Sequence, residues 1–190
     1  MNEIIGIHHV TAITGSAQAN LDFYTAVLGM RLVKKSVNQD SPGTYHLFFA
    51  DADGTPGTDL TFFPWDDSPR MQQGIGLAME VSLAVHADSV AYWRKRLADH
   101  GVELDGEEDR RDDHALLFRD PFGQSIALVG TGDAREFAAW SNSPVPAEHQ
   151  IRGLHSARLW ERDLELTSGF LTNVLGFHSM GESDGWHRFG

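Results

Sequence analysis

The chain has 190 residues, of which 41% are hydrophobic and 22% charged, a composition typical of a globular protein with a packed core. Its 15 Lys and Arg against 27 Asp and Glu give a net charge of -12, which argues against binding to phosphate backbones. The sequence has no cysteine, which excludes disulfides, thiolate metal ligands and a cysteine nucleophile. It has no signal-peptide pattern and no apolar stretch near the ~20 residues of a membrane helix, so we expect a cytoplasmic protein that contacts no membrane.

The first part of the chain predicts a strand, a helix and three further strands. Residues 4–13 are rich in the β-branched side chains that strands favour. Ser16 or a neighbour can cap the helix that follows, and Gly29 can end it with a positive φ. Further strands are expected at residues 31–37, 44–50 and 59–63. The unit is βαβββ, and we call it module one (about residues 4–65).

The next part predicts a diverged copy of this unit, module two (about residues 74–131). Residues 77–85 resemble a strand, and residues 89–100 a helix that Gly101 ends. Strands are expected at 115–118 and 125–129. The charged run at 107–113 contains both acidic and basic residues, and we interpret it as a solvated loop.

A third copy begins at about residue 151. Residues 23–30 (FYTAVLGM) return as residues 170–177 (FLTNVLGF), and a histidine-bearing apolar stretch precedes each block. The third unit stops before its last strands, so we expect a fragment of a longer protein. We predict an α+β fold of repeated βαβββ modules. Its expected parts are an N-terminal domain (1–135), a linker (136–150) and the truncated start of a second domain (151–190).

Several motifs carry a family resemblance. Phe-Tyr-x-x-Val-Leu-Gly at 23–29 and Asp-Pro-x-Gly at 120–123 resemble the vicinal-oxygen-chelate superfamily, which includes glyoxalase I, bleomycin-resistance proteins and extradiol dioxygenases. Other segments resemble one subgroup, the hydroquinone-type ring-cleaving dioxygenases. These segments are 7–11 (IHHVT), 32–35 (LVKK), 43–47 (GTYHL), 54–58 (GTPGT), 61–65 (TFFPW) and 151–156 (IRGLHS). The likeness covers nearly the whole chain.

The resemblance implies a metal-dependent ring-cleaving dioxygenase of the extradiol type. In that subgroup paired modules form a cup, in which two histidines and one glutamate hold Fe(II) or Mn(II). Such a triad leaves open positions for a bidentate substrate and for O2. The expected partners are therefore O2 and a small hydroquinone- or catechol-like aromatic. Nothing in the sequence decides the oligomeric state, and a homodimer remains open.

The resemblance also implies the ligands. Adjacent strand residues point to opposite faces, so His8 and His9 cannot both be ligands from a regular strand. The family pattern selects His9 and leaves His8 as a catalytic acid or base behind it. His155 is the second expected ligand. The repeat aligns His9 with Ser156, however, so His155 needs a one-residue bulge to point inward. The third ligand is expected beyond Gly190. By residue type alone, any of these histidines could instead be a packed core histidine.

Module two does not offer a second metal site. Its carboxylate position is occupied by Ala127, and Glu80 falls near its histidine position. In module one, Asp59 begins a strand that has no further carboxylate. Tyr45 and His46 on the third strand are candidates for binding an aromatic substrate, with ordinary core packing as the alternative for Tyr45.

Two other functions remain open from the sequence. A glyoxalase-like lyase or isomerase would use the same cup without O2, but it needs a base carboxylate that neither module supplies. A non-catalytic module that binds a small aromatic, like the bleomycin-resistance proteins, would need no complete metal site.

Overall fold

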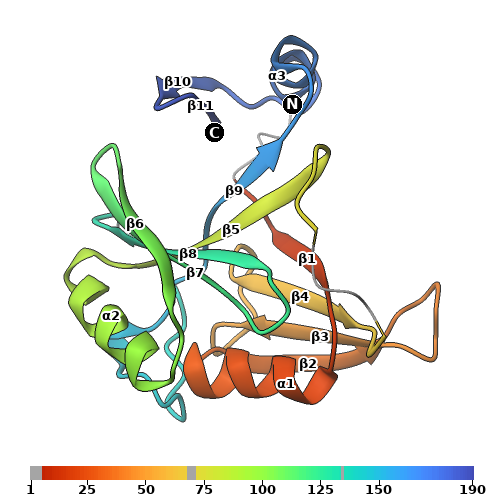
Figure 1. Ribbon diagram of the computed structural model, residues 1–190, viewed down its shortest axis with the longest axis vertical. Coiled ribbons are helices and arrows are strands. Elements are labelled where there is room, and N and C mark those ends of the chain that lie inside the picture. Colours follow the sequence, from red (N-terminus) through yellow and green to blue (C-terminus); the bar gives the residue numbers. More distant parts are fainter. Residues whose placement is uncertain (1–5, 68–71, 134) are drawn as a thin grey trace.

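The computed structural model describes residues 6–67, 72–133 and 135–190 and has the predicted α+β fold (Figure 1). Module one comprises β1 (His9–Thr14), α1 (Ala17–Asp22) with its π-helical continuation η1 (Phe23–Val27), β2 (Arg31–Val37), β3 (Tyr45–Ala50) and β4 (Asp59–Pro64). The sheet order is β1-β4-β3-β2, with β1 parallel to β4. The βαβββ order therefore matches the prediction, although residues 4 and 5 of the expected first strand lie outside the described residues.

Module two comprises β5 (Leu77–His86), η2 (Ala87–Ser89), α2 (Val90–Asp99), β6 (Leu104–Arg110), β7 (Asp113–Arg119) and β8 (Ser125–Thr131). The solvated loop expected at 107–113 is wrong, because residues 107–110 belong to β6 and Asp113 begins β7. Side chains of β6 alternate between exposed and partly buried. The charged run thus ends one strand, turns and begins the next, and the partly buried charges of β6, Glu108 and Arg110, are paired within the protein.

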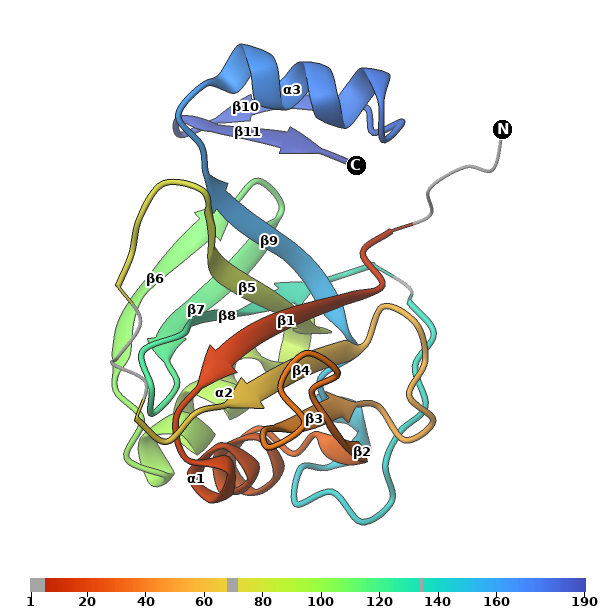
Figure 2. The ribbon, with the colours of Figure 1, turned by 90° about the vertical axis from the view of Figure 1, so that its right-hand side faces the viewer.

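The third segment contains η3 (Ala147–His149), β9 (Leu154–Trp160), α3 (Leu164–Asn173), β10 (Ser179–Ser183) and β11 (Trp186–Phe189). Strand β9 pairs antiparallel with β5, so the module-two sheet has the order β6-β7-β8-β5-β9. Helix α3 and the β10–β11 hairpin lie beyond the end of β9, apart from the two main sheets (Figure 2). The division of the chain into domains stays a prediction.

One hydrophobic core joins modules one and two. It contains Tyr24, Phe49 and Phe62 from module one, and Trp93 and Phe118 from module two. Each of these side chains is at most 1% exposed. The segment between the modules and β9 also packs here: Ser143 Oγ donates a 2.8 Å hydrogen bond to the carbonyl of Gly29.

Gly29 shows why the helix of module one ends where it does. Its φ is +71°, as the prediction of a C-terminal glycine required. A Cβ at this position would lie 2.5 Å from Val145 Cγ2, so no other residue fits without displacing the segment that follows module two.

The two motifs of the superfamily contact each other. Tyr24, in the helix motif, donates a 3.2 Å hydrogen bond to Asp120 Oδ2, in the Asp-Pro-x-Gly turn. Asp120 Oδ1 in turn accepts the backbone N–H groups of Phe122 and Gln124, each at 2.9 Å. Burial raises the pKa of the Asp120 carboxyl, although the backbone hydrogen bonds oppose this, and it also raises the pKa of Tyr24. Tyr24 and Asp120, one from each motif, therefore have a structural role, because they join module one to module two.

This buried carboxyl makes a prediction about pH. Because the folded pKa of Asp120 is raised, the folded protein holds the proton more tightly, and stability falls as pH rises from the unfolded pKa of 3.8 through the folded one. Asp120→Asn keeps the oxygen that accepts the two backbone N–H groups, and its amide nitrogen replaces the oxygen that accepts from Tyr24, so the tyrosine oxygen would become the acceptor. We expect this variant to gain stability relative to wild type as pH rises from about 4 to about 7. Urea unfolding at several pH values measures the free energy of unfolding of both proteins. If the value for the variant minus the value for wild type falls as pH rises, the prediction is wrong.

Candidate functional site

A large hollow lies between the main sheets and the third segment. It has a volume of about 1650 Å³. Its lining residues come from the start of β1, strand β9, the β6–β7 turn, helix α3 and the β10–β11 hairpin, elements that can be found in Figures 1 and 2. Both predicted metal ligands, His9 and His155, line it. The lining also includes the aromatic side chains Trp160, Phe177 and Trp186.

His155 lies at the bulge that the sequence required. The pairing of β9 with β5 joins Ser156 to Ser82 and Leu154 to Leu83, so the register slips by one residue and His155 is the extra residue between them. The predicted bulge is thus confirmed. Its imidazole is 6% exposed, and burial lowers the pKa of His155, an effect that nearby Asp113 opposes. Burial therefore favours the neutral ring, the form that binds metals.

Hydrogen bonds engage both ring nitrogens of His155. Its Nε2 lies 3.3 Å from Asp113 Oδ2, and its Nδ1 lies 3.0 Å from Ser156 Oγ. Since a carboxylate only accepts, Nε2 donates to Asp113 and the Ser156 hydroxyl donates to Nδ1. The ring is thus held in one orientation by two neighbours from different strands.

His9 begins β1, and its side chain is exposed. Its Nδ1 lies 3.1 Å from Nδ1 of His8, and the two rings meet edge to face. Asp59 is its partner on the neighbouring strand β4. Partial burial raises the pKa of Asp59, and the two histidines oppose that shift. The start of β1 therefore holds two imidazoles in contact, of which His9 lines the hollow, and Asp59 lies on the neighbouring strand.

Two glycines bring the starts of β1 and β9 together. The N–H of Gly57 donates to the carbonyl of His8, and the carbonyl of Gly57 accepts the N–H of Leu154, both at 2.8 Å. Gly153 has φ +119°, and a Cβ there would lie 2.7 Å from the Gly57 oxygen. This close backbone approach connects the segments that carry His9 and His155.

The structure separates the two predicted substrate-binding residues. The His46 ring packs against the rings of Phe48 and Phe63, with distances of 4.0 and 4.1 Å between ring centroids. Its Nε2 lies 3.0 Å from Thr61 Oγ1. Burial lowers the pKa of His46, and the positive charges of His9 and Lys34 lower it further. Thr61 Oγ1 also lies 2.8 Å from Thr11 Oγ1, and Thr11 is two residues along β1 from His9, so His46 lies on the face of the sheet that carries His9.

Tyr45 lies on the opposite face of the strand. It alternates with His46 and shares its face with Leu47 and Phe49, which point into the core. Tyr45 itself is 46% exposed, with the Lys35 ammonium 3.9 Å from its ring centroid. The structure therefore does not bring Tyr45 to the face of His46. The His46 assignment stays a prediction, because neither residue lines the main hollow.

Module two carries a network of ion pairs where a metal site would lie. Glu80 is opposite Ser125 in the parallel pair β5–β8, as His9 is opposite Asp59 in β1–β4. Both carboxylate oxygens of Glu80 accept hydrogen bonds from Arg110, at 2.8 and 2.9 Å. In module two the residue at the position of His9 is therefore a carboxylate bound to an arginine. This fits the sequence interpretation that module two holds no metal and is structural.

The network continues towards the hollow. Arg158 of β9 binds Glu108 at 2.7 Å, and its guanidinium lies 4.4 Å from the ring centroid of Trp186 in β11. Burial alone would raise the pKa of Glu108, but hydrogen bonds from Arg110 and Arg158 hold it below its usual range. Sequence reasoning missed Arg110, Arg158 and Asp113, because each has a partner on another strand, far away in the sequence. The signal for Arg110 and Asp113 was the mixture of acidic and basic residues at 107–113.

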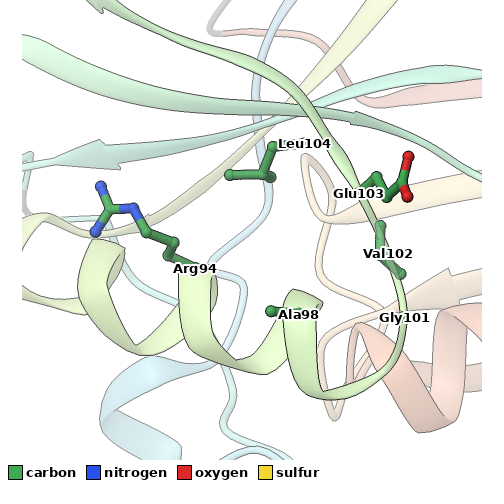
Figure 3. Close-up of a pocket in the computed structure, with 6 residues that line it drawn as sticks. All are labelled: Arg94, Ala98, Gly101, Val102, Glu103 and Leu104. Carbon is green, nitrogen blue, oxygen red and sulfur yellow. The ribbon is translucent and has the colours of Figure 1, made fainter.

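Three histidine, aspartate or glutamate side chains do not come together closely enough to hold a metal ion anywhere in residues 6–67, 72–133 and 135–190. Within the same ranges, no helix is long and apolar enough to span a membrane. A smaller hollow of about 580 Å³ lies beside α2 and the start of β6 (Figure 3). It holds none of the predicted site residues, and its arginine, Arg94, is bound to Glu107.

The fold and the histidine-lined hollow define a protein of the vicinal-oxygen-chelate type. The chain belongs to the Glyoxalase/Bleomycin resistance protein/Dioxygenase superfamily, whose family model matches residues 6–128. The sequence resemblance to this superfamily is therefore confirmed.

Relatives include proteins named as dioxygenases. A Bacillus subtilis (strain 168) protein, named provisionally as ring-cleaving dioxygenase MhqA, is 40% identical over 92% of this chain and 56% of its own length. A chlorohydroquinone/hydroquinone 1,2-dioxygenase of Sphingobium indicum is 29% identical over 97% of this chain and 58% of its own length. The chain thus spans less than two thirds of the length of these relatives.

A crystal structure confirms the likeness in three dimensions. A protein from Bacillus subtilis, described provisionally as a dioxygenase, matches with a TM-score of 0.92 and 36% identity. The match covers 100% of this chain and 60% of that one, so it includes α3 and the β10–β11 hairpin.

Proposed function

We propose that this protein is a metal-dependent ring-cleaving dioxygenase of the extradiol type, acting on a hydroquinone- or catechol-like aromatic with O2. The observation that carries the proposal is the hollow lined by His9 and His155, in a chain whose relatives are named as ring-cleaving and hydroquinone dioxygenases. Four aromatic side chains, Trp160, Phe177, Trp186 and Phe189, line the same space, a setting suited to a flat aromatic substrate.

The residues at the hollow fit a divalent ion in part. Two imidazoles are suitable donors for Fe(II) or Mn(II), and His155 is held by two neighbours and buried, which lowers its pKa and favours the neutral ring. The contact with His8 engages Nδ1 of His9, so Nε2 is the nitrogen that would take a metal. We keep the expectation of a third ligand, a carboxylate, beyond Gly190, and the described residues supply no group of three that could hold a metal ion.

The ion supplies Lewis acidity when bound, which lowers the pKa of a chelated hydroxyl and aligns the diol with O2. The protein's own groups have other tasks. His8, in contact with His9, is proposed to accept or donate the proton of a substrate hydroxyl. The aromatic walls of the hollow would hold the ring and exclude water.

Oxygen uptake tests this function. The complete gene product that carries this sequence, loaded anaerobically with Fe(II) or Mn(II), is expected to consume one O2 for each hydroquinone opened. Ring cleavage inserts both oxygen atoms of one O2 into the product, so no external reductant is needed. Mass spectrometry after reaction in ¹⁸O2 should therefore find two labelled atoms, and omission of metal should abolish uptake.

Other outcomes identify the competing functions. Turnover of a glyoxal hemithioacetal without O2 would replace the dioxygenase by a lyase or isomerase. Tight binding of hydroquinone without turnover, under every metal condition, would replace it by a binding module.

A further inference from the structure

Asp113 is an acidic residue outside the predicted ligand set that contacts His155. Its Oδ2 lies 3.3 Å from His155 Nε2, and their side chains are 16% and 6% exposed. The two residues are 42 positions apart, on β7 and β9, and two strands (β8 and β5) lie between β7 and β9 in the sheet. The contact therefore spans the face of the sheet rather than joining neighbouring strands.

The local backbone places Asp113 for this contact. It begins β7 directly after a tight turn in which Arg111 adopts φ 59°, a left-handed conformation that costs a non-glycine residue free energy. Asp113 pairs along the backbone with Arg110, but the Arg110 guanidinium is bound to Glu80 and Glu108. Among the ion pairs of the described residues, the Asp113 carboxylate has His155 as its partner.

The two nitrogens of His155 differ in what they face. Nδ1 contacts Ser156, and both residues line the hollow. Nε2 contacts Asp113, which is not among the lining residues. The carboxylate thus lies behind the ring, and its acceptance of the Nε2 proton makes Nδ1 the acceptor nitrogen on the side of the hollow. The Ser156 hydroxyl donates to this nitrogen, and a cation bound there would displace that hydroxyl.

We propose that Asp113 is a positioning residue that fixes the ring orientation and the tautomer of His155 for binding a divalent cation in the hollow. This inference rests on the proposed function, because it takes His155 as a ligand. Carboxylates behind ligating imidazoles raise their basicity and fix their direction, and removing one typically lowers metal affinity by about 10–100-fold.

The test combines a metal-free and a metal-bound measurement. In the metal-free protein, ¹⁵N NMR of the histidine rings reports the tautomer of His155, which we expect to carry its proton on Nε2. Asp113→Ala should produce a mixture of tautomers, and it should lower Mn(II) affinity by about 10–100-fold. Asp113→Asn keeps an oxygen that can accept from Nε2, so its affinity should lie between wild type and Asp113→Ala.

Asp109→Ala is the matched control. Asp109 lines the same hollow and contacts a different histidine, His114, at 2.7 Å. We expect this variant to leave the His155 tautomer and the Mn(II) affinity within about twofold of wild type.

The outcomes separate this inference from the proposed function. An unchanged tautomer and unchanged affinity in Asp113→Ala would overturn the positioning role. If His155→Ala leaves Mn(II) affinity unchanged, His155 is not a ligand and both the ligand assignment and this inference fail. If His155→Ala abolishes binding but Asp113→Ala does not weaken it, only the inference fails.

Discussion

Arg110→Ala is expected to lower the free energy of unfolding by about 3–5 kcal/mol, a large effect for one residue on the edge strand β6. The Arg110 guanidinium is 11% exposed and donates to Glu80, Ser82 and Glu108. Removing it leaves Glu80 as a nearly buried carboxylate whose remaining contact with an arginine, Arg158, is 3.7 Å long. The cost arises from the uncompensated buried charge rather than from the lost attraction alone. Urea unfolding followed by circular dichroism measures it.

Arg94 provides a matched control. Its guanidinium also binds one carboxylate, Glu107, through two hydrogen bonds of 2.7 Å, but its side chain is 46% exposed. Exposed pairs of this kind contribute about 0–1 kcal/mol, so Arg94→Ala should cost at most about 1 kcal/mol. Adding Glu80→Gln to Arg110→Ala should recover part of the loss. Equal losses for Arg94→Ala and Arg110→Ala would contradict the role of burial.

Gly153→Ala is the second variant with a large expected effect, about 2–4 kcal/mol from backbone strain and a lost hydrogen bond. Gly153 has φ +119°, and its new Cβ would lie 2.7 Å from the oxygen of Gly57. Relief of this clash must separate Gly57 from β9 and stretch the 2.8 Å hydrogen bond to Leu154. Because His155 is two residues away, we also expect weaker Mn(II) binding.

Gly101→Ala separates the cost of a positive φ from the cost of a steric clash with the new Cβ. Gly101 also has a positive φ, +72°, but a Cβ there would meet nothing within 4 Å. This variant should cost only the conformational penalty of about 1–2 kcal/mol and leave Mn(II) affinity unchanged. If the two alanine variants lose the same stability, the Gly57–Gly153 contact is not the cause.

Local patterns predicted much of the fold. Ser16 caps the first helix as expected, and Gly29 ends it with a positive φ, because capping and chain reversal depend on residues within one turn. The repeat also predicted the bulge at His155, since aligning two copies exposes a one-residue mismatch that only a bulge can absorb. Such features are encoded by neighbours in sequence.

Contacts between modules were not predictable in the same way. The run at 107–113 was assigned to a loop, because its charges look solvated until Glu80 and Arg158 are placed beside it. The pairing of β9 with β5 and the Asp113–His155 contact join residues far apart in sequence. Tyr45 and His46 were grouped as neighbours, although adjacent strand residues point to opposite faces, and only His46 is coupled to His9.

Oxygen uptake by wild type and His155→Ala, measured side by side on the complete gene product with hydroquinone and either Fe(II) or Mn(II), tests the proposed function most directly. Asp109→Ala serves as the control, since it lies in the same hollow but contacts a different histidine. We predict metal-dependent uptake by wild type and by Asp109→Ala, and a loss of at least about 100-fold in His155→Ala. No uptake by wild type with either metal, or full uptake by His155→Ala, would contradict a ring-cleaving site built on this histidine.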